Sequence, residues 1–228
     1  MAIAAAPRHR WPAAVLGLAA TALALVGCGV QTTSFGVHGS GAAATQTRAV
    51  SRFSRVDLAG GNDVTVVVGG QQSVVVHADS NLIGDVSTRV EAGTLIISDT
   101  GSFSTRGPMN VQVRVPSLTA VKLSGDGIMS VSGIRAQRLT VTVPGDGVLS
   151  VNGTAAQLDV TLAGDGQAQL SGLIARDVHA VLTGSGVIQV TATTSLDAAV
   201  PGNGAIMYGG NPPHVTTSIT GNGAVTPG

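Results

Sequence analysis

The second half of the chain repeats a Gly-x-Gly triplet at nearly constant intervals, and this repeat constrains the fold more than any other feature of the sequence. Successive triplets are separated by 20, 19, 20, 18 and 19 residues. A fixed period near 20 is typical of a solenoid, in which each repeat forms one coil and stacks on its neighbours. The middle residues of the six triplets are Asp126, Asp146, Asp165, Ser185, Asn203 and Asn222.

Alternating apolar and polar residues flank the triplets. The run Leu139–Val143 precedes the second triplet, and Leu158–Leu162 precedes the third. Alternation with one apolar face predicts half-buried strands. In the runs that follow the triplets, the residues expected to point inward are Met129/Val131, Leu149/Val151, Ala168/Leu170, Ile188/Val190 and Ile206/Tyr208.

Each period has room for two short strands and two tight turns, but not for a crossover helix. Coils of this length stack with each strand paired to its copy in the next coil, about 4.8 Å away. The sequence therefore predicts an all-β fold, a parallel β-helix with a repeat of about 20 residues. A sandwich built from hairpins is the alternative, but it does not account for six turns in register.

The first half of the domain is less regular. Residues 53–115 contain short β runs broken by turn residues, and we expect them to cap or start the solenoid, with the repeats beginning near Leu118. Gly69-Gly70 stands between the runs Val64–Val68 and Ser73–His77, which predicts a hairpin turn. The 32 glycines and the many Val, Thr, Ile and Leu residues favour strands and turns over helices.

The N-terminus has the three parts of a bacterial lipoprotein signal. Residues 8–10 are basic, and the apolar stretch 13–26 is shorter than the roughly 20 residues of a membrane span. The stretch ends in Leu25-Val26-Gly27-Cys28, which resembles a lipobox. We therefore expect residues 1–27 to be a signal peptide. Cys28 is then the lipidated first residue of the mature protein, held to the membrane by its acyl chains.

Cys28 is the only cysteine, so no intramolecular disulfide can form. A plain secretory signal with an incidental cysteine and a signal-anchor helix are the alternatives to a lipoprotein. Residues 28–49 are rich in Gly, Ser, Thr and Ala and predict a flexible tether after the lipidated cysteine. Residues 50–228 then form a single β-helix domain.

The order of several segments resembles a known family. These segments are Phe53–Leu58 followed by Asp63–Val66, then Val74–Leu82, Val90–Ile97 and the Gly-Asp-Gly, Gly-Ser-Gly and Gly-Asn-Gly triplets. Together they are similar to the putative auto-transporter adhesin, head GIN domain family over residues 50–228. The resemblance implies a right-handed β-helix-like fold, and it brings no catalytic residues to this chain.

The six middle residues of the triplets, which we name the turn ladder, are the main candidate site. Stacking would bring neighbouring members near 5 Å apart. Three consecutive carboxylates could then bind Ca²⁺ through their oxygen atoms. Paired carboxylates could also cleave a glycosidic bond, but nothing distinguishes two of them by role. We favour a structural role, in which the glycines adopt φ > 0 and the short polar side chains bond to turn backbone. The replacement of Asp by Ser or Asn in the second half of the ladder supports this interpretation.

Composition excludes several classes of function. The predicted mature chain loses two of the 12 basic residues and none of the 12 acidic ones, so its formal net charge is −2. Nucleic-acid binding, which needs positive charge and stacking rings, is not expected when aromatics are 2% of the chain. The histidines have no metal-ligand spacing, so we expect no metal site and no cofactor; outside the signal they are His38, His77, His179 and His214.

These patterns predict a non-catalytic, lipid-anchored protein of the cell envelope, located outside the cytoplasm. Its long parallel faces suit adhesion to, or structural support of, an envelope protein or a glycan. The alternatives are a carbohydrate-active enzyme on the same scaffold and an accessory lipoprotein that senses the state of the envelope.

Overall fold

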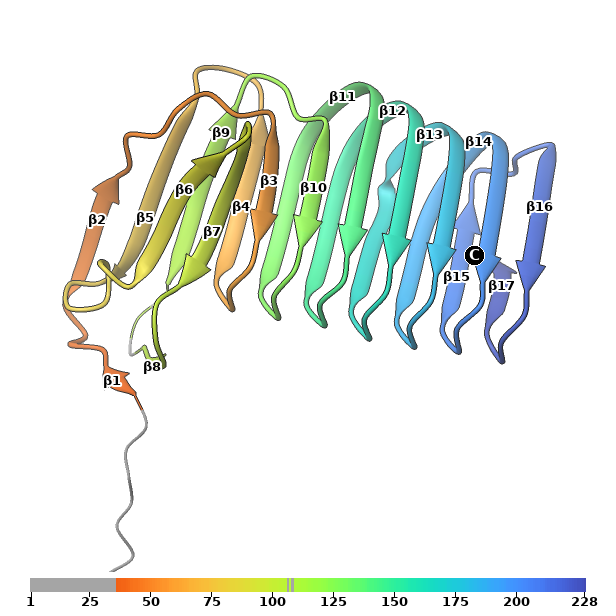
Figure 1. Ribbon diagram of the computed structural model, residues 1–228. Helices are drawn as coiled ribbons and strands as arrows, with labels where there is room; N and C mark the ends of the chain where they lie inside the picture. Colours follow the sequence, from red (N-terminus) through yellow and green to blue (C-terminus); the bar gives the residue numbers. More distant parts are fainter. Residues whose placement is uncertain (1–35, 106, 108) are drawn as a thin grey trace, which may run out of the picture. The chain divides into compact units, whose positions relative to one another are not determined.

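The computed structural model describes residues 36–105, 107 and 109–228, and these residues form strands, turns and loops without a helix. They build a solenoid of stacked coils (Figure 1). The predicted all-β parallel β-helix with a repeat near 20 residues is confirmed. Among the described residues, no helix has the length and apolar character needed to span a membrane.

Each coil of the second half contributes one strand to each of two facing layers. Layer 1 contains the strands that follow the Gly-x-Gly turns, and layer 2 contains those that precede them. The coils are made from β11 (Ile128–Val143), β12 (Val148–Leu162), β13 (Gln167–Leu182), β14 (Val187–Val200), β15 (Ala205–Gly209), β16 (His214–Ile219) and β17 (Ala224–Pro227). β11 to β14 each pass through both layers, whereas β15 and β17 belong to layer 1 and β16 to layer 2.

The coils have two edges. The Gly-x-Gly turns stack along one edge, which we call the turn edge, at the bottom of Figure 1. The opposite edge, where β11 to β14 pass from layer 1 to layer 2, is the bend edge. All neighbouring strands of these coils pair in parallel, with Leu139 opposite Leu158 and Val178 opposite Leu196.

The first coils do not follow the order of the chain. β3 (Arg55–Leu58) and β4 (Asp63–Val68) form a coil that stacks directly on β10 (Ala120–Leu123) and β11. β7 (Thr94–Asp99) pairs with the other side of β3, and β9 (Asn110–Val115) pairs with the other side of β4. The coil of β3 and β4 therefore lies between two coils that come later in the sequence.

Antiparallel strands cover the N-terminal end of the solenoid. β5 (Ser73–Asp79) pairs with β9 and with β2 (Ala43–Thr47), and β6 (Val86–Glu91) pairs with β7. β1 (Val37–His38) precedes β2 in the chain and pairs in parallel with β8 (Phe103–Ser104), which lies between β7 and β9 in the chain.

This arrangement corrects two predictions. Gly69-Gly70 does not form a hairpin, because β9 lies between β4 and β5 and pairs with both. The flexible tether predicted over residues 28–49 is wrong for residues 37–38, which form β1 and pair with β8, and for residues 43–47, which form β2 and pair with β5. The Ala and Thr content of residues 43–47 signals a linker, but the open edge of β5 supplies backbone partners that composition does not reveal.

Aliphatic side chains from both layers form the core. The inward series predicted from alternation is confirmed: Met129, Leu149, Leu170 and Ile188 are all buried, and Tyr208, in the penultimate layer 1 strand, is partly exposed. Only about 10 Å separates packed sheets, so the interior holds Leu, Ile, Val and Ala. Among the described residues, Phe53 is the one buried aromatic side chain.

The glycines of the triplets are needed for close approach between coils and not for an unusual φ, which corrects the expectation of φ > 0. None of the triplet glycines from Gly125 to Gly223 has φ in the left-handed region. A Cβ on Gly145 would instead lie 2.7 Å from the carbonyl oxygen of Ser124 and nearer still to that of Gly125. Left-handed glycines occur at the bend edge, with φ of 79° at Gly133 and 139° at Gly153.

We expect Gly145→Ala to lower the free energy of unfolding by about 1–3 kcal/mol, the usual cost of forcing atoms into a packed site. Gly61→Ala is the matched control, because it lies in the equivalent turn of the β3–β4 coil and a Cβ there meets no atom within 4 Å. The control should change stability by less than about 1 kcal/mol. Thermal or urea unfolding of both variants measures this, and equal effects would contradict the steric explanation.

Candidate functional site

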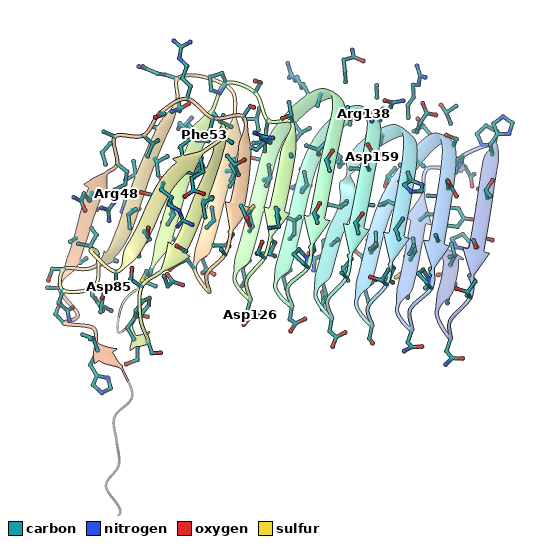
Figure 2. The ribbon with its side chains drawn as sticks, in the orientation of Figure 1. Arg48, Phe53, Asp85, Asp126, Arg138 and Asp159 are labelled. Carbon is teal, nitrogen blue, oxygen red and sulfur yellow. The ribbon has the colours of Figure 1, made fainter. Side chains whose placement is uncertain are left out.

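The turn ladder projects from the turn edge into solvent, and all six of its members are exposed. Figure 2 shows Asp126 at this edge. The side chain of one member can reach the backbone of the next: Oδ1 of Asp146 accepts a hydrogen bond from the backbone N–H of Asp165 at 2.9 Å. Oδ1 of Asp165 accepts in the same way from Ser185 at 3.1 Å. These two carboxylates therefore join consecutive coils.

The ladder changes its hydrogen bonding where serine replaces aspartate. The backbone N–H of Asn203, which follows Ser185 in the ladder, donates to the carbonyl of Gly184 at 3.1 Å. Backbone can thus replace the carboxylate as an acceptor, which favours a role in the turns over a role that needs charge. Within the described part of the chain, no three His, Cys, Asp or Glu residues are close enough to hold a metal ion.

A second polar group lies on the outer surface of layer 2, and we name it the carboxylate cluster. Parallel register places Asp159 beside His179 and His179 beside Asp197, while Asp177 lies beside Ser195 in the adjoining row. These side chains line a shallow hollow of about 200 Å³ together with Arg138 and Gln157. Figure 2 shows Asp159 and Arg138 on layer 2, towards the bend edge.

Each carboxylate of the cluster has a partner. Nδ1 of His179 lies 3.1 Å from Oδ2 of Asp197, and Nη1 of Arg138 lies 3.6 Å from Oδ2 of Asp159. The hydroxyl of Ser195 donates to Oδ1 of Asp177 at 2.8 Å. The cluster is consequently a set of bonds between neighbouring coils.

The electrostatics of Asp177 do not suit the general acid of a glycosidase. The hydrogen bond from Ser195, supported by the neighbouring Arg176 guanidinium, lowers the pKa of Asp177 below its ordinary value. A general acid for glycosidic cleavage needs a raised pKa so that it still carries a proton near neutral pH. Asp177 is therefore a stable anion and a poor proton donor at that pH.

The structure does not bring the predicted histidines together into one site. Cys28 lies outside the described residues. His38 contacts Ser104, and His77 contacts Thr45, so these histidines belong to different parts of the N-terminal cap. Sequence reasoning missed the carboxylate cluster. The same 18–20-residue period, applied to the outward strand positions 159, 179 and 197, would have found it.

The turn ladder should not need calcium. We expect the melting temperature to be the same in millimolar Ca²⁺ and in chelator, because the carboxylates of Asp146 and Asp165 already bond to backbone. A cation present at 100 times its dissociation constant would add about 2.7 kcal/mol, a shift of several degrees for a domain of this size. Asp146→Asn should be nearly neutral, since its amide oxygen can still accept from Asp165. A calcium-dependent shift that disappears in Asp146→Asn would show that the ladder is a cation site.

Solved structures contain the same fold. A putative adhesin from Bacteroides fragilis has 24% identity and a TM-score of 0.70, and the match covers 84% of this chain and all of that one. A putative lipid binding protein from Parabacteroides distasonis has 21% identity and a TM-score of 0.56, with 84% of this chain and 99% of that one covered. At these identities the likeness shows a shared fold. No curated protein matches the chain in sequence.

The family comparison extends over most of the solenoid. The family described as "Putative auto-transporter adhesin, head GIN domain" matches residues 52–212, which is more than half of the chain and includes five of the six Gly-x-Gly turns. The resemblance inferred from the order of the sequence segments is thereby confirmed. The chain belongs to the putative auto-transporter adhesin, head GIN domain family.

Proposed function

We propose that this protein is a non-catalytic binding module of the bacterial cell surface, anchored in the membrane through acylated Cys28. The observation that carries the proposal is the parallel register of the outward side chains. Equivalent positions recur about every 4.8 Å along the solenoid, and such a surface suits an extended partner. Membership of an adhesin-like family supports a surface binding role.

The names of the structural neighbours agree with binding and not with catalysis. One is called a putative adhesin and another a putative lipid binding protein. The carbohydrate-active enzyme remains the alternative, since layer 2 carries three carboxylates near one another. The lowered pKa of Asp177 and the partners of Asp159 and Asp197 argue against it.

The outer rows of layer 1 support the same interpretation. Ser130, Ser150, Gln169 and Gln189 occupy equivalent positions in four consecutive strands. The hydroxyl of Ser150 donates to Oε1 of Gln169 at 3.1 Å, so these side chains bond along the solenoid axis. Hydroxyls and amides are neutral donors and acceptors, and they offer a partner hydrogen bonds without any group suited to proton transfer.

The binding role is tested with the full mature lipoprotein in detergent, immobilised and exposed to fragmented cell envelope. We expect it to retain envelope material and to release no new reducing ends from a panel of polysaccharides. Asp177→Asn should leave both results unchanged, because the carboxylate serves the contact between coils. Polysaccharide cleavage that is lost in Asp177→Asn would replace the binding role with the enzymatic one.

Anchoring through Cys28 predicts the behaviour of the protein in detergent. The wild-type chain should enter the detergent-rich phase, because each buried CH₂ of an acyl chain contributes about 0.8 kcal/mol. Cys28→Ala removes the acceptor thiol, so this variant should stay in the aqueous phase. Ser34→Ala, a change in the same segment that leaves the thiol intact, is the control and should partition like the wild type. A wild-type protein found wholly in the aqueous phase would contradict the anchor.

A further inference from the structure

The bend edge is irregular at the coil before β11, because the two strands that meet there are not consecutive in the chain. In β11 one continuous segment passes from layer 1 to layer 2 through Gly133. In the preceding coil β4 and β10 occupy the corresponding positions, but they are not consecutive in the chain. β4 leads through Gly69 to β5, and β10 is reached from β9 through residues 116–119. This crossover replaces the regular bend.

Two hollows lie beside the crossover. The larger, about 660 Å³, lies between the crossover and the bend of β11 and is lined by Arg55, Arg135 and Arg138. The other, about 570 Å³, is lined by Arg52, Phe53 and the pair Gln71 and Gln72. Ser117 lines both hollows, so they are neighbours on the same edge. Figure 2 shows Phe53 and Arg138 at this edge, opposite the edge that carries Asp126.

The hollows are cationic although the chain is not. Four arginines line them, and no Asp or Glu is among their lining residues, while the formal net charge of the whole chain is zero. Arg52 and Arg135 have neither a hydrogen bond nor an ion pair with any described residue. Arg55 donates to the carbonyl of Ala92, and Arg138 donates to Gln157 and forms an ion pair with Asp159. Two guanidinium groups are thus available to an outside ligand.

The surface between the arginines is apolar and concave. Leu118, Ala120 and Ala136 line the larger hollow, and Leu118 is 3% exposed. The aromatic ring of Phe53 beside the smaller hollow is also buried, at 6% exposure. A membrane surface is typically bound by protruding apolar and aromatic side chains, and neither hollow presents one. The shape favours a chain-like ligand that enters the edge over a flat bilayer.

We propose that these hollows form a binding site for an acidic glycan, which is a chain of sugars that carry carboxylates. Arg135 and Arg52 would bind these carboxylates. Guanidinium groups bind carboxylates through two parallel hydrogen bonds. The CH faces of sugar rings fit the apolar surface of Ala120 and Ala136, while Ser117, Thr119 and Gln137 offer hydrogen bonds to hydroxyls. The proposal rests on the binding role given above and names its ligand class.

The test uses a hexamer of galacturonic acid as the probe and its fully methyl-esterified form as the neutral control. Binding to the full mature lipoprotein in detergent is measured by calorimetry at low and at physiological salt. We expect the acidic hexamer to bind and the ester to bind at least tenfold more weakly. Affinity should fall as salt rises, because exposed charges are screened.

Charge variants assign the site. Arg135→Gln and Arg52→Gln should each weaken the acidic hexamer about tenfold, the usual loss for one charge-assisted hydrogen bond. Arg176→Gln is the matched control, because it removes the same charge from an exposed arginine that lines neither hollow. The control should bind normally. Both residues of the site are exposed, so unchanged melting temperatures are expected, and circular dichroism verifies the fold.

Three results would overturn the assignment: equal affinity for acid and ester, equal affinity in wild type and Arg135→Gln, or binding of the unacylated Cys28→Ala variant to phosphatidylglycerol vesicles without binding to the hexamer. The last result would assign the arginines to a lipid surface. Retention of envelope material that persists in Arg135→Gln and Arg52→Gln would leave the general binding role standing while removing the acidic glycan from it. Loss of retention in wild type would remove the binding role itself.

Discussion

The close stacking of backbone at the turn edge is the constraint on which the rest of the structure depends. At this edge a carbonyl oxygen of one coil occupies the space that a Cβ on a glycine of the next coil would need, as Gly125 does with Gly145. Backbone hydrogen bonds therefore continue around the turns, with Val148 donating to Gly127 at 3.1 Å and Gln167 to Gly147 at 3.0 Å. A Cβ would push the coils apart and break the strand register on both sides of the turn.

Strand register in turn determines the polar surface. Most polar contacts on layer 2 join one coil to the next: Lys122 to Asp57, Arg138 to Asp159, and Ser195 to Asp177. Exposed pairs of this kind contribute about 0–1 kcal/mol each, so they favour the correct register more than they add stability. They also pair Lys122 and Arg138 with carboxylates, whereas Arg52 and Arg135 at the bend edge have no such partner among the described residues.

The sequence was informative where structure is local and uninformative where it is long-range. The period of the triplets predicted the coils, and alternation predicted buried residues such as Met129 and Leu149, because both patterns lie within one repeat. The insertion of the β3–β4 coil between β7–β9 and β10–β11 could not be predicted, since it depends on pairing between β4 and a strand more than 40 residues away. The triplet glycines were recognised, but composition does not distinguish a left-handed φ from a close approach by another coil.

The same insertion explains why a ligand site would lie at the bend edge and not along the regular faces. A uniform solenoid presents equivalent hollows in every coil, so a ligand has no preferred position along it. The crossover at residues 116–119 breaks this equivalence once, and it brings Arg55 beside Arg135 and Arg138, which are 80 or more residues later in the chain. Specific recognition by a repetitive fold requires such an interruption, and here the interruption coincides with arginines that have no carboxylate among the lining residues.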